Sequence, residues 1–228
     1  MTSAHHLSGL QARGALAPGG SPGLGLEIAA GLAAMGARLA ISARKPEDLD
    51  AAREQLQAQG AEVLAVVNDL AAPEGPRQLA DAVLAHYGAV DVLVNNAGRG
   101  WAEPAEQMPP ERLRQLMRLN AESPFELSAE LARRSMIPRG WGRVINVASI
   151  LGLRTRMPAG ARPPMAAYAT SKAAAVHMTR ALAAEWGRYG ITVNAIAPGP
   201  FPSRMNSSLG TVEADFISRT PTGRLGRD

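Results

Sequence analysis

Cysteine is absent from the 228 residues, which excludes disulfide bonds, thiolate catalysis and cysteine-ligated metals. Lysine is almost absent, since Lys45 and Lys172 are the only lysines among the 24 basic residues and all others are arginines. The arginines are scattered among acids rather than grouped, so the net charge of +4 indicates a solvated surface. The composition argues against a nucleic-acid partner, and we expect no metal site.

Long apolar runs are also lacking. No segment reaches the roughly 18 consecutive apolar residues of a membrane helix. Residues 1–14 show neither the apolar core nor the cleavage site of a secretion signal. We expect no membrane partner and a cytoplasmic location. A length of 228 residues with 46% hydrophobic content suits a single domain over residues 1–228.

Short apolar runs, rich in β-branched residues, alternate with amphipathic segments. The runs are typical of parallel strands covered on both faces. They are Arg38–Ser42, Glu62–Val67, Val90–Val94, Arg143–Val147 and Ile191–Ile196. Helical spacing appears between them, in Ile28, Leu32 and Met35 and again in Met178, Leu182 and Trp186. The alternation predicts an α/β fold, a Rossmann-like doubly wound parallel sheet with helices on both faces.

Two regions fit this pattern poorly. A first strand should precede the glycine-rich turn, but Leu10–Pro18 has no β-branched residue and contains Gly14, so its propensity for a central strand is poor. No strand-like run follows Ile196, and we expect the C-terminal edge strand to be missing. The last run would then be a bare apolar edge.

A glycine-rich turn precedes the first amphipathic segment. Gly19, Gly23 and Gly25 would let the backbone turn tightly and let a phosphate approach the N–H groups and dipole of a helix N-terminus. Gly/Pro clusters also mark ordinary loops, and Pro18 and Pro22 remove two N–H donors. The turn by itself leaves both interpretations open.

Tyr168 and Lys172 are four residues apart in an expected helix, so their side chains share one face. A nearby ammonium favours the phenolate, which would lower the pKa of Tyr168 and make it a general acid/base. The alternative is an ordinary surface pair. Ser149 follows the apolar run that ends at Val147, at the strand edge where open parallel sheets bind ligands. It is either a donor to a substrate oxygen or a turn and N-cap residue.

Asn120 occupies a position where the helical pattern of Leu113 and Met117 expects an apolar side chain. Pro124, four residues later, has no N–H, so the carbonyl of Asn120 loses its helical partner and the helix should kink. The freed carbonyl would need another donor, for which water is the obvious choice. The alternative is a helix that ends near Asn120.

Several motifs follow one another in a specific order. They are the turn Gly19-x-x-x-Gly23-x-Gly25, then Asn95-Asn96-Ala97-Gly98, then Asn120, Ser149, Tyr168 and Lys172, and then Pro198-Gly199 followed by Ser203. With these motifs the chain resembles the short-chain dehydrogenase/reductases over almost its whole length. It is most similar to the gluconate 5-dehydrogenase-like and 3-oxoacyl-carrier-protein-reductase-like members.

The resemblance implies an oxidoreductase that moves a hydride between a nicotinamide cofactor and a small alcohol or carbonyl substrate, and a homo-oligomer. Tyr168 would exchange the proton, Lys172 would lower its pKa and hold the ribose, Ser149 would orient the carbonyl, and Asn120 would position a water. Asp69 looks like the adenine contact. The implied cofactor-binding residues are Gly19, Ser21, Gly23, Leu24, Gly25, Arg44, Asp69, Leu70, Asn96, Ala97, Gly98, Tyr168, Lys172, Pro198, Gly199 and Ser203.

Charge predicts the choice of cofactor. A carboxylate after the second strand would select NAD(H), but Arg44 and Lys45 stand there and suit a 2′-phosphate. We therefore expect NADP(H) to be preferred, with NAD(H) as the alternative. Pro22 weakens this expectation, because related NADP(H) enzymes often carry a basic residue at that turn position.

Some features depart from the family pattern. Pro18 stands where a threonine usually opens the turn, and the family's closing helix and edge strand do not follow Ile196. These departures keep a second hypothesis open, a degenerate or truncated nucleotide-binding protein with little turnover. Arginines near the expected pocket, among them Arg99, Arg154 and Arg156, would suit an anionic substrate. Ordinary surface arginines are the alternative.

Overall fold

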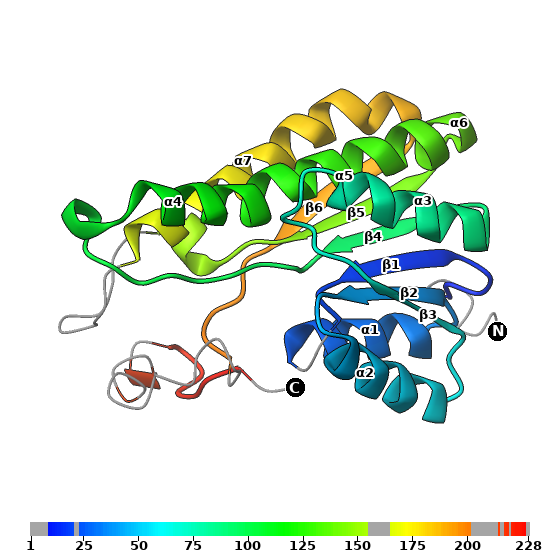
Figure 1. Ribbon diagram of the computed structural model, residues 1–228, viewed down its shortest axis with the longest axis horizontal. Helices are drawn as coiled ribbons and strands as arrows, with labels where there is room; N and C mark the ends of the chain where they lie inside the picture. The colour runs from blue at the N-terminus through cyan, green and yellow to red at the C-terminus, as the bar shows by residue number, and fades with distance from the viewer. Residues whose placement is uncertain are drawn as a thin grey trace.

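The computed structural model describes residues 9–20, 23–154, 165–201, 214, 217, 218 and 220–226. Its centre is a six-stranded parallel sheet in the order β3-β2-β1-β4-β5-β6 (Figure 1). The strands are β1 (Gly14–Pro18), β2 (Arg38–Ala43), β3 (Val63–Val67), β4 (Val92–Asn95), β5 (Gly142–Val147) and β6 (Ile191–Ile196). The strand order reverses between β1 and β4, which is where sheets of this kind bind ligands.

Helices cover both faces of the sheet, and each face has its own apolar core (Figure 1). On one face lie α1 (Leu24–Ala34) and α2 (Pro46–Ala58). On the other lie α3 (Gly75–Tyr87), α4 (Pro110–Met117), α5 (Ser123–Leu131) and α7 (Ala166–Trp186), with the single turn α6 (Ile137–Arg139). Buried Leu49 and Leu56 of α2 pack in the first core, and Leu79, Leu131 and Leu182 pack in the second. The doubly wound α/β prediction is confirmed.

The poor first strand is nevertheless a central one. β1 lies between β2 and β4, and all five of its residues are buried. Packing outweighs propensity here, because β1 is enclosed by close neighbours and even Leu16 is fully buried. Gly14 shows how close they are, since a Cβ there would lie 2.5 Å from the carbonyl oxygen of Ala89. Pro18 is the last residue of the strand, where a missing N–H costs least.

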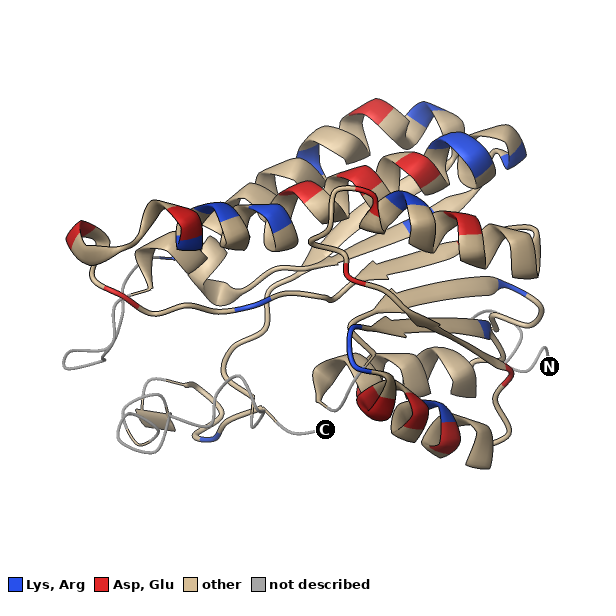
Figure 2. Ribbon diagram, in the orientation of Figure 1, with Lys and Arg blue, Asp and Glu red and all other residues tan. Residues whose placement is uncertain are grey.

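β6 forms the far edge of the sheet and pairs with β5 alone. No strand follows it in the residues that the structure describes. The sequence predicted a bare apolar edge. The exposed residues of β6 are instead mixed, since Thr192 and Asn194 are polar while Ala195 and Ile196 are apolar. Within the described ranges, no helix combines the length and apolar character needed to cross a bilayer. Acidic and basic residues are interspersed along the helices (Figure 2), as expected for a solvated surface.

Candidate active site

Ser149, Tyr168 and Lys172 converge at the carboxyl edge of β5. Ser149 follows that strand and opens the 3-10 turn η5 (Ile150–Gly152), where its Oγ accepts a hydrogen bond from the backbone N–H of Leu151 at 3.2 Å. Ser149 also lies beside the phenol of Tyr168, in the first turn of α7, and lowers the pKa of that phenol. Of the two alternatives for Ser149, the turn and cap role is confirmed, and a bond to a substrate oxygen stays a prediction.

Lys172 is buried on the same face of α7, with only 6% of its surface exposed. Its ammonium donates a hydrogen bond to the carbonyl oxygen of Val147 at 2.7 Å and lies 5.9 Å from the centre of the Tyr168 ring. Burial lowers the pKa of Lys172 from 10.5 to about 8. An ordinary surface pair is excluded by this burial.

The pKa of Tyr168 corrects the sequence argument. We expected the neighbouring ammonium to lower it, but the pKa is raised above 10.0 because burial disfavours the phenolate. Ser149 acts in the opposite direction and only partly compensates. In this structure Ser149, rather than Lys172, is therefore the side chain that favours ionisation of the phenol.

Asn120 lies in a π-helical turn, η3 (Arg118–Glu122), which joins α4 to α5. Pro124 has no N–H to donate to the preceding turn. The helix does not end there. Its hydrogen-bonded ring becomes one residue longer, because the Ser123 N–H bonds the Arg118 carbonyl, five residues earlier. Of the two alternatives, the interrupted helix is confirmed and the helix that ends near Asn120 is wrong.

The side chain of Asn120 holds three segments together. It is 2% exposed, accepts a hydrogen bond from the Arg99 N–H, and donates to the Arg99 carbonyl and to Ser171 Oγ, each at 2.9 Å. A Cβ on Gly98 would lie 3.1 Å from Asn120 Oδ1 and 3.3 Å from Lys172 Nζ, so only glycine leaves these groups this close. Ser171 was missed by the sequence reasoning, because no pattern distinguishes a buried serine within a helix.

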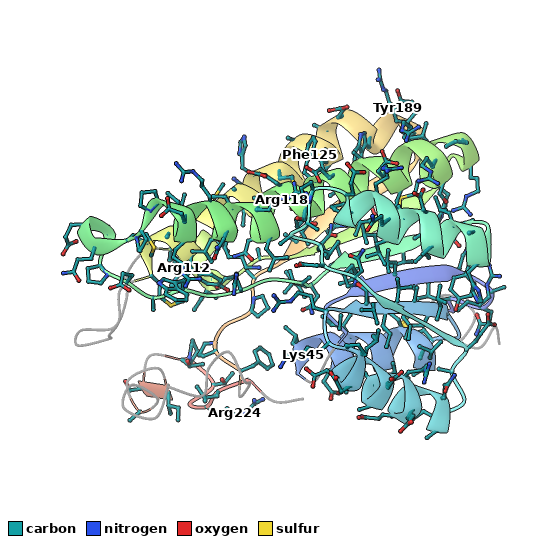
Figure 3. The ribbon with its side chains drawn as sticks, viewed as in Figure 1. Lys45, Arg112, Arg118, Phe125, Tyr189 and Arg224 are labelled. Carbon is teal, nitrogen blue, oxygen red and sulfur yellow. The ribbon has the colours of Figure 1, made fainter. Side chains whose placement is uncertain are left out.

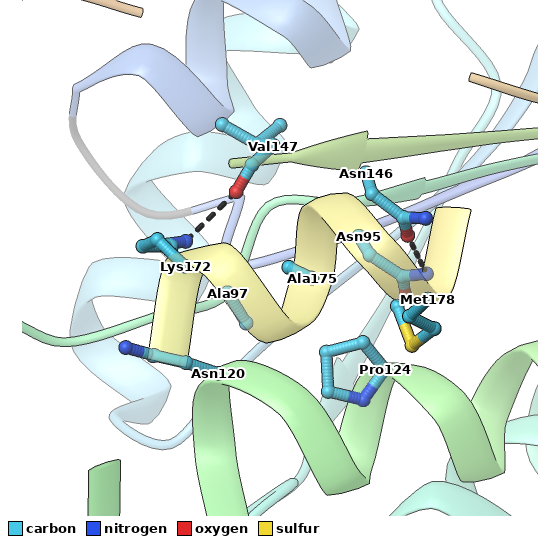
Figure 4. Close-up of a pocket in the computed structure, with 9 residues that line it drawn as sticks. All are labelled: Asn95, Ala97, Asn120, Pro124, Asn146, Val147, Lys172, Ala175 and Met178. Atoms are coloured by element: carbon cyan, nitrogen blue, oxygen red, sulfur yellow. Dashed lines mark hydrogen bonds between the residues drawn. The ribbon is translucent and has the colours of Figure 1, made fainter. Parts of the chain in front are cut away.

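A small cavity lies behind these residues (Figure 4). Its volume is about 10 Å³, near the lower limit for one water molecule. Asn120 and Lys172 line one end of it, and the asparagines of β4 and β5 line the other. The lining residues are Asn95, Ala97, Asn120, Pro124, Asn146, Val147, Lys172, Ala175 and Met178.

The described residues of the glycine turn leave space beside the N-terminus of α1. Gly19 and Gly23 have φ angles of +77° and +120°, which side chains rarely adopt, and the side of Gly23 is open, with no atom within 4 Å of a Cβ position. Gly25 lies in the first turn of α1, and a Cβ there would overlap the carbonyl oxygen of Gly19. That oxygen accepts a hydrogen bond from Asn96 Nδ2 at 3.1 Å. The open cradle fits a phosphate at a helix N-terminus. Ser21 and Pro22 lie outside the described residues.

The other expected cofactor contacts follow the carboxyl ends of the strands. Arg44 is exposed directly after β2, and it makes no ion pair in the described part of the chain. Lys45, which is exposed beside it at the start of α2, is labelled in Figure 3. Asp69 is exposed after β3, and one of its oxygens accepts the Ala71 N–H at 3.0 Å, while Leu70 is buried. Within the described ranges, neither of these two cationic side chains forms an ion pair.

The segment after β6 is described as far as residue 201. The carbonyl of Pro198 accepts the N–H of Ile150 at 3.1 Å, which places Pro198 and Gly199 beside the turn that follows Ser149. Ser203, Arg204 and Arg156 lie outside the described residues. Across the described ranges, no group of three or more metal-ligating side chains occurs.

These features define an α/β oxidoreductase that uses NAD(P) and acts on alcohol or carbonyl groups. Residues 14–214 match the model of the family described as short chain dehydrogenase. The chain belongs to this family.

Named relatives cover nearly all of the chain. It is 34% identical over 216 residues to gluconate 5-dehydrogenase of Gluconobacter oxydans, covering 93% of this chain and 82% of the relative. It is 38% identical over 230 residues to the rhamnolipids biosynthesis 3-oxoacyl-[acyl-carrier-protein] reductase of Pseudomonas aeruginosa, covering 98% and 87%. A gluconate 5-dehydrogenase of Burkholderia cenocepacia, solved with NADP and tartrate, matches with a TM-score of 0.89 and 35% identity, covering 98% and 86%.

Proposed function

We propose that the protein is an NADP(H)-dependent reductase or dehydrogenase in which Asn120, Ser149, Tyr168 and Lys172 act as one catalytic set. The observation that carries this proposal is the convergence of Ser149, Tyr168 and Lys172 at the carboxyl edge of β5, with Asn120 across Gly98. A bound nicotinamide would supply or accept the hydride. The chain's own residues would handle the proton and orient the substrate.

Tyr168 exchanges a proton with the substrate oxygen in this proposal. Its raised pKa keeps the phenol protonated at neutral pH, which suits it to donate during carbonyl reduction. Ser149, which lies beside the phenol, would bond the same substrate oxygen and stabilise the alkoxide that develops on it. Lys172, with a pKa of about 8, exchanges protons near neutral pH and faces the cavity that could hold a water.

Replacement of the phenol tests the acid/base role. Tyr168→Phe removes one oxygen and should lower kcat roughly 10²- to 10⁴-fold, with little change in NADPH affinity. Single-turnover rates and fluorescence titration with NADPH measure the two quantities. Equal rates for variant and parent would refute the catalytic set.

A preference for NADP(H) over NAD(H) rests on the charge after β2. Arg44 and Lys45 are exposed there without a carboxylate partner among the described residues, and solved relatives contain NADP. Reversing the charge with Arg44→Glu should shift the ratio of kcat/KM for NADPH over NADH toward NADH by at least about tenfold, the equivalent of about 1.4 kcal/mol. A parent enzyme that turns over NADH faster at equal concentration would contradict the preference.

A small carbonyl or alcohol that carries an anionic group is the substrate class we propose. Arg99 is fixed by its two backbone bonds to Asn120, and Arg154 follows η5; neither forms an ion pair in the described residues. The relatives named above act on gluconate or on 3-oxoacyl groups. A screen of sugar acids and 3-oxoacyl thioesters with NADPH tests the class, and equal activity on uncharged analogues would contradict it.

Pro18 favours a second candidate, a nucleotide-binding protein with little turnover. Proline at the start of the turn supplies neither a hydroxyl nor an N–H to brace it. Calorimetry with NADPH, combined with a turnover assay on many carbonyl compounds, separates the two candidates. Tight binding without turnover would support the second.

Homo-oligomerisation, a single domain over residues 1–228 and a cytoplasmic location also remain proposals. Phe125 is 49% exposed on the outer side of α5, where Figure 3 labels it, and a subunit contact would bury it. Sedimentation of the purified protein measures the oligomeric state, and a monomer at micromolar concentration would contradict the first proposal.

A further inference from the structure

Two asparagines interrupt the apolar strands at the centre of the sheet. Asn95 ends β4 and Asn146 lies near the end of β5, and the two residues are direct neighbours in the parallel register. Both are buried, at 6% and 2% exposure. A buried amide is costly unless its hydrogen bonds are made, so the first question is where these amides find partners.

The partners form one continuous chain across four elements. Asn95 Nδ2 donates to Ser128 Oγ of α5 at 3.0 Å. It also donates to Asn146 Oδ1 at 2.8 Å (Figure 4). Asn146 Nδ2 donates to Thr179 Oγ1 of α7 at 2.9 Å. Ser128 and Thr179 in turn donate to carbonyls of their own helices, Pro124 at 2.6 Å and Ala175 at 2.8 Å. We call Ser128, Asn95, Asn146 and Thr179 the buried amide chain.

Each element in this chain carries part of the proposed active site. α5 continues from the π-helical turn that contains Asn120, β4 leads into the loop of Gly98, β5 leads to Ser149, and α7 carries Tyr168 and Lys172. Thr179 follows Lys172 by seven residues, which is two helical turns along the same face of α7.

Asn146 is the hub of the arrangement. It contacts β4 through its oxygen and α7 through its nitrogen. The next residue, Val147, supplies the carbonyl that holds the Lys172 ammonium, and Ser149 follows two residues later. A shift of α7 relative to β5 would therefore break the bond to Thr179 and move Tyr168 and Lys172 away from Ser149 and the Val147 carbonyl.

We infer that the residues of the buried amide chain are positioning residues for catalysis. They fix how α7 lies against β5, and this placement determines the distance from Ser149 to Tyr168. Stability alone does not require the buried amide chain, because replacing both partners of a buried hydrogen bond with apolar groups of the same shape is nearly neutral. A fully satisfied buried network instead favours a single arrangement of the elements it joins. The inference rests on the proposed function.

Thr179→Val tests the inference at the end of the chain nearest Tyr168. Valine keeps the shape but removes the acceptor of Asn146 Nδ2. We expect kcat to fall about 10- to 100-fold, while KM for NADPH changes less than about twofold, because misplaced catalytic groups affect the chemical step first. Thr179→Ser restores the hydroxyl and should recover kcat to within about threefold of the parent.

Ser135→Ala is the matched control. Ser135 is buried, and its Oγ accepts the Val90 N–H and donates to the Val90 carbonyl. Replacing it therefore also removes buried hydrogen bonds. These bonds lie ahead of β4, at the opposite end of the sheet from the proposed active site. Both variants should lower Tm, and only Thr179→Val should lower kcat. Should Thr179→Val not fold, Ser128→Ala probes the chain from α5, with a several-fold loss of kcat expected.

Three results would overturn the inference. They are a parental kcat in Thr179→Val, no recovery in Thr179→Ser, or an equal loss of kcat in Ser135→Ala. Tyr168→Phe, measured alongside, separates the two levels of the argument. If it is as active as the parent, the proposed function fails; if it is inactive while Thr179→Val is fully active, only the positioning role fails.

Discussion

Lys172 is a cation that the fold keeps almost entirely out of water. Its ammonium bonds a single protein acceptor, the Val147 carbonyl, and burial lowers its pKa to about 8. A buried charge without a carboxylate destabilises a protein, and such groups concentrate at functional sites. The position of Lys172 is therefore explained by the chemistry proposed for Tyr168 rather than by folding.

Lys172→Met should raise the free energy of unfolding at pH 7 by about 2–3 kcal/mol. Below pH 8 Lys172 is protonated in the folded parent. Its charged form is more stable in the unfolded chain, where the pKa of the lysine is near 10.5. Between pH 8 and 10.5 the folded parent has released the proton and the unfolded chain still binds it, so the parent gains stability with rising pH. The advantage of the variant should shrink over this window.

Urea unfolding of parent and variant at pH 7, 8.5 and 10 measures this difference. Groups that both proteins share, including Tyr168, cancel in the comparison. A difference that stays constant with pH would mean that Lys172 is not the buried cation described above, and the turnover of the variant should be strongly reduced at every pH.

At the scale of elements, the glycine turn and α1 show how close approach is built. Gly19 begins the turn with its N–H bonded to the Ser42 carbonyl at 2.9 Å, and its own carbonyl is held by Asn96. Gly25 packs against that carbonyl, so α1, β2 and the loop after β4 meet around one peptide. The described part of the turn is therefore held from three sides, which would preorganise it for the phosphate proposed to bind there.

Gly25→Ala should displace this peptide. The added methyl group would overlap the Gly19 carbonyl, and we expect a loss of about 1–3 kcal/mol in the free energy of unfolding together with a higher Kd for NADPH. Gly31→Ala, in the same helix, is the control, because nothing lies within 4 Å of its Cβ position. Alanine there should stabilise the protein by about 0.5–1 kcal/mol and leave Kd unchanged. Equal Kd values for both variants would contradict the role of Gly25.

At the scale of the whole molecule, stability and chemistry occupy opposite ends of the sheet. Ahead of β4, buried Asp91 accepts hydrogen bonds from the Gly14 N–H at 2.8 Å and from Arg13 and Arg139 at 3.0 Å each. This carboxylate joins the start of β1, the start of β4 and the segment that leads to β5. The proposed catalytic set lies at the carboxyl ends of the same strands.

Asp91→Ala should therefore reduce stability without changing the chemistry. It leaves the Gly14 N–H buried without its acceptor, and we expect a loss of about 2–4 kcal/mol with kcat per folded molecule within about twofold of the parent. Asp81→Ala removes an exposed ion pair to Arg134 and should cost less than about 1 kcal/mol. Urea unfolding and active-site titration check both values. A large loss of kcat in folded Asp91→Ala would show that the two ends are coupled.

The sequence by itself determined the layered α/β fold and the order of the family's motifs along the chain. Periodicity and motif spacing are local properties, and they predicted five of the six strands within about two residues. Gly19, Gly23 and Gly25, and the pair of Tyr168 and Lys172, were identified because turns and helix faces are also local.

Only the tertiary structure decided the remaining features. β1 is a central strand because its residues are buried between β2 and β4, which no propensity reveals. The pKa of Tyr168 rises because the packed fold buries the phenol, an effect larger than that of a lysine one turn away. The contacts from Asn146 to Asn95 and Thr179 join residues 51 and 33 positions apart in the chain, and such distances become short only once the whole sheet and α7 have packed together.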